Sequence, residues 1–376
     1  MTPWLLVSGD FTRLGGMDRA NHALASFLAR RGTPLHLVAH RVSDDLAALP
    51  NVTVHAVRRP GGRHLAGFPL LAARARRVAS RLGPGSRVLA NGGNASFPSP
   101  VWIHYLHAAF APAPARSFRS RVATAVSGAY FRRQERRAVT RAPLLICNSE
   151  RTARDVRERY NVAAARTTVV YYGTDDEFDV ATAADRSASR SRLGIADDAR
   201  VALFVGALAD RRKGFDLLFE VWRRLCADPG WDVDLLVAGA GAVRDRWPAE
   251  ANRARLGSRV RILGFRDDLA SVLAAADLVV HPARYEAYGL GVHESLCRGI
   301  PAVVTTTAGV AERFPSEMRA LLLPDPPASE SLIRALIAWR RDADEWSRKA
   351  QTASAVIRQR RWDDMALDIV RAVESL

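Results

Sequence analysis

The sequence has few cysteines and no long apolar run. Cys147, Cys226 and Cys297 are too far apart for the paired spacing of a metal site, and their odd number does not suit a disulfide framework. No stretch approaches the roughly 18 consecutive apolar residues of a membrane-spanning helix. The apolar run Trp4–Val7 has no basic region before it, so it predicts a first strand and not a signal peptide. We therefore expect a cytoplasmic protein that meets a membrane only at its surface.

Acidic residues are scarce in the first half of the chain. The 376 residues carry a formal net charge of +16, yet residues 1–173 alone have a net charge of +18 and residues 174–376 one of −2. Lys213 and Lys349 are the two lysines, so the basic residues are almost all arginine. A GC-rich genome accounts for arginine in place of lysine, but not for a shortage of acids in one half. The charge therefore predicts an anionic partner for the first half.

Short apolar runs alternate with helical patterns along both halves of the chain, which predicts parallel, doubly wound sheets with helices on both faces. The pattern changes near residues 172–175, and a polar, helix-poor stretch is expected up to about Ser191. We therefore expect Rossmann-like domains at residues 1–173 and 174–376, with a cleft at the carboxyl ends of their strands. Residues 339–376 are expected to be helical. The expected strands are Trp4–Val7, Leu35–Ala39, Val52–Val57, Val88–Ala90, Val101–Leu106, Leu144–Cys147, Val201–Val205, Val233–Ala238, Val260–Leu263, Leu278–His281 and Ala302–Thr305.

A glycine and three cations follow the expected strand Val201–Val205. Gly206 ends the strand, and Arg211, Arg212 and Lys213 stand in a short loop before an expected helix. Helix N-termini and cations both stabilise phosphate oxygens, so the arrangement predicts a diphosphate site. The alternative interpretation is a solvated basic turn.

Two carboxylates and two glycines follow the expected strand Leu278–His281. Glu286 lies in the loop and Glu294 lies eight residues later, about one turn inside an expected helix, while Gly289 and Gly291 let backbone amides approach a ligand. Carboxylates are poor phosphate ligands but good acceptors for sugar hydroxyls. Together with the cations they indicate a sugar nucleotide. Taken singly, the two carboxylates would be a helix N-terminal charge and a surface residue.

These motifs resemble those of the retaining glycosyltransferases of family 4, over nearly the whole chain. The resemblance implies a GT-B fold, in which two Rossmann-like domains face a central cleft. It implies an acceptor-binding first domain, a nucleotide-sugar-binding second domain, and a last helix, at about 361–376, that crosses back to the first. The matching residues are the Glu-x7-Glu pattern at 286 and 294, Gly15-Gly16, Cys147-Asn148-Ser149, Tyr172-Gly173-Thr174-Asp175, Arg212-Lys213-Gly214 and Arg361-Trp362.

The resemblance also implies roles for single residues. Arg212 and Lys213 would bind the donor diphosphate, and Glu286 would contact hydroxyls of the transferred sugar. Glu294 would hold the ribose hydroxyls of the donor. Gly16 would let the N-terminal loop close over the phosphates, and backbone amides would meet the sugar and the phosphates. The further donor-binding positions that the resemblance implies are Gly206, Tyr288, Gly289 and Leu290.

Three positions leave alternatives open. Ala207 stands where many family members have arginine, so either Arg211 or Arg212 reaches the phosphate. His107 matches a histidine that the family often places beside the donor sugar. We expect it in that role because it ends the expected strand, whereas His104 has the parity of a mid-strand residue. Ala287 replaces a common glycine, which predicts a local backbone difference.

Residues 116–141 contain eight arginines and a single acid, Glu135, with Phe118, Val122 and Val126 at helical spacing. A basic amphipathic helix of this kind lies well on an anionic membrane surface, and each arginine near the surface contributes ~1 kcal/mol. The alternative is that the apolar stripe belongs to the core and the arginines are simply solvated. The expected acceptor or membrane surface is formed by Arg116, Arg119, Arg121, Arg132, Arg133, Arg136 and Arg137.

The resemblance and the residues together predict a retaining hexosyltransferase. It would move a sugar from a UDP- or GDP-sugar to a hydroxyl of a membrane-associated glycolipid or growing polysaccharide in bacterial envelope glycan synthesis. We expect no cofactor and no metal, because no DxD-like loop and no metal-spaced cluster occurs. An epimerase or phosphorylase of the same fold is one alternative. A nucleic-acid-binding protein is another, given the sequence pI of about 10.9, although no nucleic-acid-binding module is recognisable.

Overall fold

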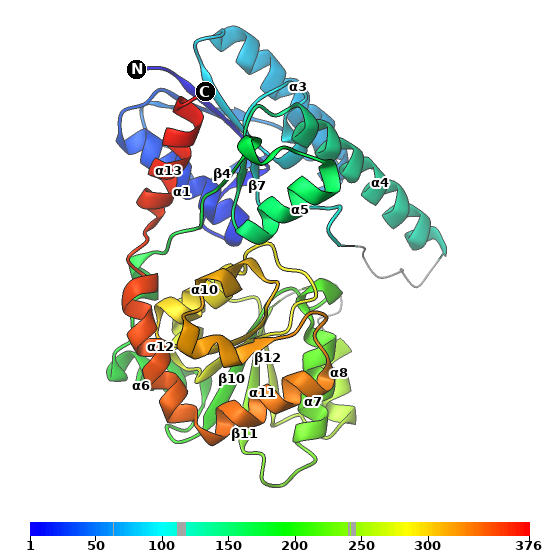
Figure 1. Cartoon of the computed structure of the whole chain (residues 1–376), viewed down its shortest axis with the longest axis vertical. Helices are drawn as coiled ribbons and strands as arrows, with labels where there is room; N and C mark the ends of the chain where they lie inside the picture. The colour runs from blue at the N-terminus through cyan, green and yellow to red at the C-terminus, as the bar shows by residue number, and fades with distance from the viewer. Residues whose placement is uncertain (63, 111–117, 240, 242–245) are drawn as a thin grey trace. The chain divides into compact units, whose positions relative to one another are not determined.

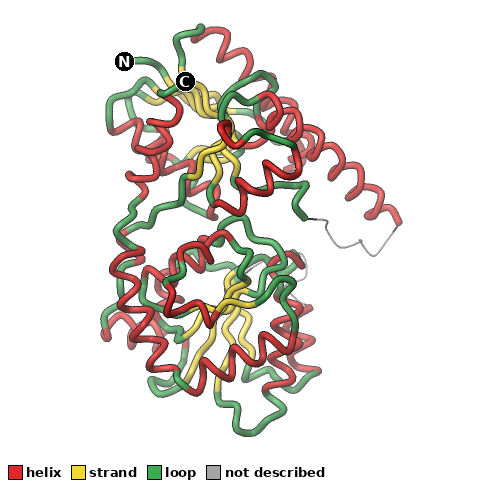
Figure 2. The backbone as a smooth tube through the Cα atoms, viewed as in Figure 1, coloured by secondary structure: helices red, strands yellow, loops and turns green. Residues whose placement is uncertain are grey.

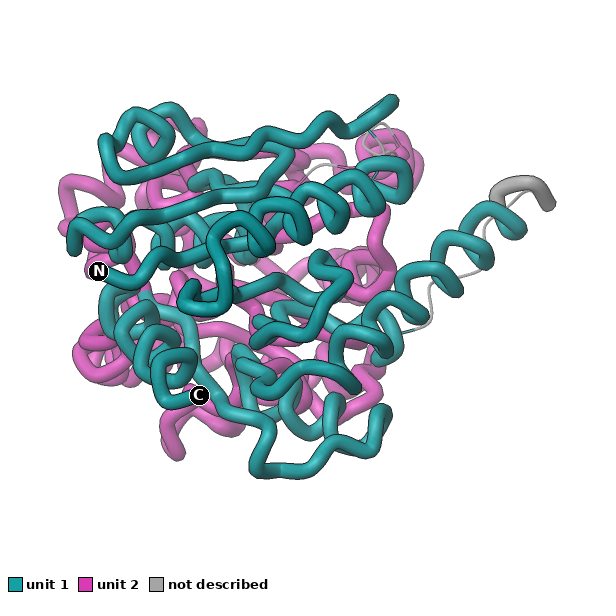
Figure 3. Tube along the Cα trace, turned by 90° about the horizontal axis from the view of Figure 1, so that it is seen from above, with its two compact units in different colours: residues 1–173, 361–376 teal, residues 174–360 magenta. Residues whose placement is uncertain are grey.

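Two compact units make up the chain in the computed structural model. The model describes residues 1–62, 64–110, 118–239, 241 and 246–376, with the backbone alone for residues 118–120. One unit comprises Met1–Gly173 and Arg361–Leu376, and the other comprises Thr174–Arg360 (Figure 3, teal and magenta). Each unit contains a parallel sheet with helices around it (Figure 2). The prediction of two doubly wound α/β domains is therefore confirmed.

The sheet of the first unit has the order β5-β3-β1-β6-β7-β8-β9 among the described residues. The chain winds from β1 to one edge, returns to β6 beside β1, and then winds to the other edge. The strands are β1 Trp4–Val7, β3 Leu35–Ala39, β5 Val52–Ala56, β6 Arg87–Asn91, β7 Val101–Ile103, β8 Leu145–Cys147 and β9 Thr167–Val169. A separate parallel pair joins β2 Asp10–Phe11 and β4 Arg41–Val42.

Helices cover the sheet of the first unit because its strands are apolar on both faces. Leu5 and Val7 of β1 pack with Leu71, Ala75 and Val78 of α3. The last helix, α13, lies beside α1 (Figure 1). The helices are α1 Gly16–Arg30, α2 Asp44–Ala47, α3 His64–Leu82, α4 Phe118–Arg141, α5 Glu150–Tyr160 and α13 Trp362–Glu374.

The second unit also has a parallel sheet, with the strand order β12-β11-β10-β13-β14-β15 among the described residues. Its strands are β10 Arg200–Val205, β11 Val233–Ala238, β12 Val260–Gly264, β13 Leu278–His281, β14 Ala302–Thr305 and β15 Leu322–Leu323. Its helices are α6 Ala183–Leu193, α7 Phe215–Leu225, α8 Arg246–Arg253, α9 Leu269–Ala274, α10 Leu290–Cys297, α11 Ser329–Arg341 and α12 Ala343–Ile357.

The expectation of a helix-poor stretch up to Ser191 is wrong, because α6 begins at Ala183. The helix starts with a capping box, in which Thr182 and Asp185 each accept a hydrogen bond from the backbone of the other. Arg190 lies on the inner side of this helix, is fully buried, and donates to the carbonyls of residues 196, 197 and 199. A buried arginine interrupts the apolar periodicity by which a helix is recognised in a sequence.

Two further expectations need correction. The strand expected at Val101–Leu106 ends at Ile103, because the carbonyl of His104 accepts a hydrogen bond from the Asn148 side chain at 3.1 Å. His104 is therefore not a mid-strand residue. The helical region expected over residues 339–376 is broken into α11, α12 and α13, with breaks at Asp342 and at residues 358–361.

The junction between Gly173 and the start of α13 gives the first prediction. A Cβ atom added at Gly173 would lie 2.2 Å from the carbonyl carbon and oxygen of Arg361. Both contacts are with backbone, which cannot move aside as a flexible side chain would. We expect Gly173→Ala to lower the free energy of unfolding by ~3 kcal/mol. The matched control is Gly85→Ala, where no atom lies within 4 Å of the added Cβ. Urea titrations of both variants check this, and equal midpoints would contradict it.

Candidate functional site

The strand order of the second unit defines a switch point between β10 and β13. The chain runs from β10 to β11 on one side, whereas β13 continues to β14 on the other. The loops that leave the carboxyl ends of β10 and β13 therefore diverge, and open α/β sheets bind ligands at such points. These loops contain the two motifs singled out in the sequence, the cations at 211–213 and the carboxylate at 286.

Lys213 and Glu286 meet at this point. The Nζ atom of Lys213 lies 2.5 Å from Oε2 of Glu286, and Nε2 of His281 lies 2.9 Å from the same oxygen. The Glu286 side chain is 9% exposed. Burial by itself would raise the pKa of Glu286, but Lys213, His281 and Arg212 together hold that pKa well below its usual range. The site therefore presents a carboxylate that is charged at neutral pH, beside two cations.

His281 was not recognised in the sequence, where it appears as the last residue of an ordinary buried strand. Burial lowers its pKa, although the hydrogen bond with Glu286 acts in the opposite direction. The neutral imidazole donates its Nε2 proton to Glu286 and stacks at 6.0 Å on Phe204 of β10. The signal that could have found it is its position at the carboxyl end of a strand beside the switch point.

The two arginines of the loop have different partners. Arg212 donates to Asp210 through Nε at 3.0 Å and Nη2 at 2.8 Å, and its charge acts on both Glu286 and His281. Arg211 is 60% exposed and pairs with Asp216 at 3.2 Å. The geometry thus places Arg212, and not Arg211, in the electrostatic neighbourhood of Glu286.

A second set of contacts holds the two loops together. The backbone N–H of Arg284 donates to the carbonyl of Arg212 at 2.8 Å, and the Arg284 guanidinium donates to Asp216 at 2.7 Å. Gly214 allows this close approach, since its φ is +77° and an added Cβ would lie 2.0 Å from the Pro282 carbonyl oxygen. Arg284 and Asp216 were not among the expected site residues.

The remaining predicted donor residues lie along the same edge of the sheet. Gly206 follows β10 and donates to the carbonyl of Ala238 at 3.0 Å. Gly289 caps α10, and Leu290 is the first residue of that helix, where amide protons lack intrahelical acceptors. The Tyr288 ring is buried within the unit, and the Tyr288 hydroxyl lies 3.1 Å from Nδ1 of His293. Glu294 is buried on α10.

The two candidate histidines have different surroundings in the first unit. His104 is buried, its Nδ1 is hydrogen-bonded to the Tyr172 hydroxyl, and burial lowers its pKa to about 3. The side chain of His107 is 41% exposed, and its Nδ1 lies 3.0 Å from Glu135. Of these two histidines, His107 is the one that is partly exposed, and the contact with Glu135 holds one side of its ring. Gly16, the other predicted residue here, begins α1.

The arginine-rich segment forms α4. Arg121, Arg132, Arg133, Arg136 and Arg137 are exposed. Arg116 lies outside the described residues, and so does the side chain of Arg119. Val122 and Val126 are 47% and 60% exposed, so this part of the stripe does not belong to the core. Further along the helix, Tyr130 and Phe131 meet Phe68 edge to face.

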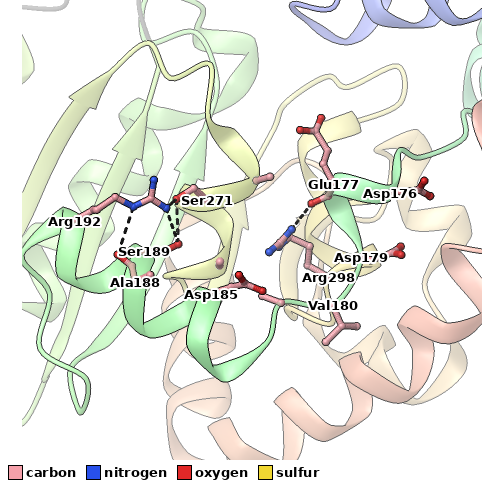
Figure 4. A pocket seen from close by; sticks show the side chains of 13 residues that line it. Asp176, Glu177, Asp179, Val180, Asp185, Ala188, Ser189, Arg192, Ser271 and Arg298 are labelled. Carbon is pink, nitrogen blue, oxygen red and sulfur yellow. Dashed lines mark hydrogen bonds between the residues drawn. The ribbon is translucent and has the colours of Figure 1, made fainter.

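A pocket of about 400 Å³ lies elsewhere in the second unit, between α6, α9 and residues 176–181 (Figure 4). None of the predicted site residues lines it. The Arg298 side chain donates to the Glu177 carbonyl at its edge. In the described part of the chain, no group of three or more histidine, cysteine or acidic side chains is arranged to hold a metal ion. None of the helices described is both long and apolar enough to cross a membrane.

Comparison with known proteins assigns the fold and the family. The chain has the GT-B fold of glycosyltransferases, because solved glycosyltransferase structures match it over nearly its whole length. A family model described as Glycosyltransferase Family 4 matches residues 14–178, and one described as Glycosyl transferases group 1 matches residues 199–342. The two models together match most of the chain, which belongs to this family of glycosyltransferases. The family resemblance seen in the sequence is thus confirmed.

Among curated relatives, the D-inositol 3-phosphate glycosyltransferase of Geodermatophilus obscurus is 32% identical over 219 residues, which are 55% of this chain and 48% of that protein. The chain spans about half the length of the curated relatives it matches. Among solved structures, Anabaena Alr3699/HepE in complex with UDP-glucose has a TM-score of 0.73 at 21% identity over the whole of both chains. The lipopolysaccharide glycosyltransferase WaaG has a TM-score of 0.72 at 20% identity over 95% of this chain and 94% of its own.

The buried pair of Lys213 and Glu286 gives the second prediction. Lys213→Ala removes the nearest cation and leaves a buried carboxylate with weaker compensation, so we expect a loss of about 3–5 kcal/mol in unfolding free energy at pH 7. The pKa of Glu286 is lowered in the folded state, so its charged form stabilises the fold above the unfolded pKa of about 4.3 and this contribution is lost as the pH falls below it. The difference between wild type and variant should therefore narrow below about pH 4.3.

The matched control for this experiment is Arg211→Ala, which removes an exposed cation of the same turn and should change the unfolding free energy by about 1 kcal/mol or less. Urea denaturation at pH 7, at pH 5 and at about pH 3 measures both variants, since the contribution of Glu286 is lost progressively below its unfolded pKa. A Lys213→Ala deficit that stays constant over this range would contradict the assigned ion pair.

Proposed function

We propose that this chain transfers a sugar, with retention of anomeric configuration, from a UDP- or GDP-sugar to an acceptor hydroxyl. The observation that carries the proposal is the cluster of Lys213, Glu286 and His281 at the switch point of the second unit. It combines a fixed cation for a diphosphate with a charged carboxylate for sugar hydroxyls. Relatives that act as glycosyltransferases, and a neighbour in fold solved with UDP-glucose, support this class of donor.

In the proposed reaction the bond between the anomeric carbon and the diphosphate oxygen breaks, and the diphosphate leaves with growing negative charge. Lys213, Arg212 and the N-terminus of α10 stabilise that charge. Glu286 holds hydroxyls of the transferred sugar, and Glu294 holds the ribose. The acceptor oxygen forms the new bond to the anomeric carbon on the face that the diphosphate leaves. The leaving phosphate takes the proton of that hydroxyl, so neither an enzyme nucleophile nor a metal ion is required.

The acceptor half of the proposal rests on charge. The first 173 residues have a net charge of +18, and α4 presents exposed arginines together with exposed Val122 and Val126. We propose that this surface lies on the anionic inner face of the plasma membrane. The acceptor is then a lipid-linked glycan or growing polysaccharide of the cell envelope.

The donor is tested by a panel of UDP- and GDP-sugars, scored by binding and by slow hydrolysis in the presence of EDTA. Removal of one fixed donor to a developing anion typically costs ~100- to 1000-fold in kcat. We expect Lys213→Ala and Glu286→Ala each to lose hydrolysis of the best donor by about this factor. Arg211→Ala is the control and should retain turnover. Wild-type behaviour of both site variants would show that the site is wrongly assigned, and inhibition by EDTA would refute metal-independent turnover.

The membrane surface is tested by flotation with two liposome preparations, one of phosphatidylcholine alone and one that also contains anionic phosphatidylserine, since polybasic segments are attracted to a negative surface potential. Replacing Arg133, Arg136 and Arg137 by glutamine removes three cations of ~1 kcal/mol each, so we expect binding to weaken on the order of 100-fold. The charge-matched control replaces Arg319, Arg334 and Arg348, which are exposed on the second unit. Equal flotation of the two triple variants, or flotation that ignores anionic lipid, would refute the proposed surface.

A further inference from the structure

The single acid of the arginine-rich helix faces inward. Glu135 of α4 is 4% exposed, whereas its neighbours Arg136 and Arg137 are exposed. A carboxylate in such a place is costly unless donors surround it. The structure gives it four. Its Oε2 accepts from the backbone N–H of His107 at 2.6 Å and lies 3.0 Å from Nδ1 of the same residue.

The second oxygen completes the set. Oε1 of Glu135 accepts from the backbone N–H of Ala108 at 3.2 Å and from the hydroxyl of Tyr160 on α5. Burial and the hydrogen bond to Glu135 both raise the pKa of Tyr160, so its hydroxyl keeps the proton that it donates. One carboxylate thereby holds the backbone of residues 107 and 108, a ring nitrogen, and the end of a neighbouring helix.

These contacts determine which nitrogen of His107 carries the proton. A carboxylate oxygen accepts hydrogen bonds, so the Nδ1 that faces Glu135 is the donor, and in this tautomer Nε2 is left as an acceptor. Phe131, one turn before Glu135 on α4, stacks on the imidazole at 5.3 Å and 14°. Tyr105 meets the ring edge to face at 4.8 Å. The ring is therefore fixed in both orientation and tautomer, while its side chain is 41% exposed.

We propose that Glu135 is the positioning residue of His107, holding the ring so that Nε2 accepts a hydrogen bond from a hydroxyl of the donor sugar. This inference rests on the proposed function and on the family resemblance, which implies that His107 lies beside that sugar. The alternative is that Glu135 only anchors α4 to α5. Tyr160 separates the two, because its hydroxyl joins Glu135 to α5 without touching the imidazole.

The first measurement is the tautomer of His107, read from ring ¹⁵N shifts in the full chain. We expect Nδ1–H in wild type and in Tyr160→Phe. Glu135→Gln replaces one acceptor oxygen with an amide donor, so four donors can no longer be satisfied and the Nε2–H tautomer should appear. Glu135→Asp keeps the charge but withdraws it by one methylene, and it serves as the second variant if the glutamine variant does not fold. An unchanged Nδ1–H tautomer in Glu135→Gln, or in Glu135→Asp where that variant stands in, would overturn the proposal.

The second measurement is hydrolysis of UDP-glucose and GDP-mannose as probe donors. Loss of a residue that orients a site histidine costs on the order of 10-fold, so Glu135→Gln should lower kcat by about this factor with a smaller change in KM. The double variant with His107→Ala should be no slower than His107→Ala alone, because both changes remove the same contact. Tyr160→Phe should stay within about twofold of wild type, since it leaves the imidazole contact in place.

Additive losses in the double variant, or a loss in Tyr160→Phe equal to that in Glu135→Gln, would show an anchoring role instead. If wild type hydrolyses neither probe, UDP-glucose and GDP-mannose are excluded as its donors. The tautomer measurement still decides in that case whether Glu135 positions His107.

Discussion

In the second unit, nearby groups must stabilise the negative charge of one buried carboxylate. Glu286 is nearly enclosed, and its charge is stabilised by Lys213 from the turn after β10 and by His281 from the end of β13. Because these partners come from the two strands that meet at the switch point, the compensation also holds the loops together. Arg284 adds to this by donating to the Arg212 carbonyl and to Asp216. The candidate binding edge therefore follows from electrostatics together with strand order.

The same physical requirement shapes α4 in the first unit. The outer side of this helix carries solvated arginines, whereas its inner side carries Phe131 and Glu135 against His107. A single acid in a strongly basic segment would look like chance variation in a sequence. In the fold it is the buried group that four donors surround. The inner side of α4 therefore holds a histidine, and its outer side is the one proposed to meet an anionic surface.

Much of the fold could be predicted from the sequence because parallel strands buried on both faces appear as short apolar runs. The runs that became β11 and β13 are examples. What was missed has a physical reason in each case. Arg190 is buried and breaks the apolar pattern of α6, and the chain after Ile103 leaves the sheet because Asn148 takes the carbonyl of His104. Asn148 is distant in sequence from His104, and buried Arg190 also pairs with the distant Asp277 at 3.0 Å, so neither outcome can be read from the local sequence.

The sequence by itself determined the alternation of strands and helices, and it determined which residue types stand at the strand ends, since both are local properties of the chain. Only the tertiary structure decided between neighbours of the same type. Arg211 turns to Asp216 while Arg212 lies near Glu286, and His104 is buried against Tyr172 while His107 meets Glu135. Residues so close in sequence point in different directions, and in most of these contacts the partner comes from a distant segment that folding alone brings near.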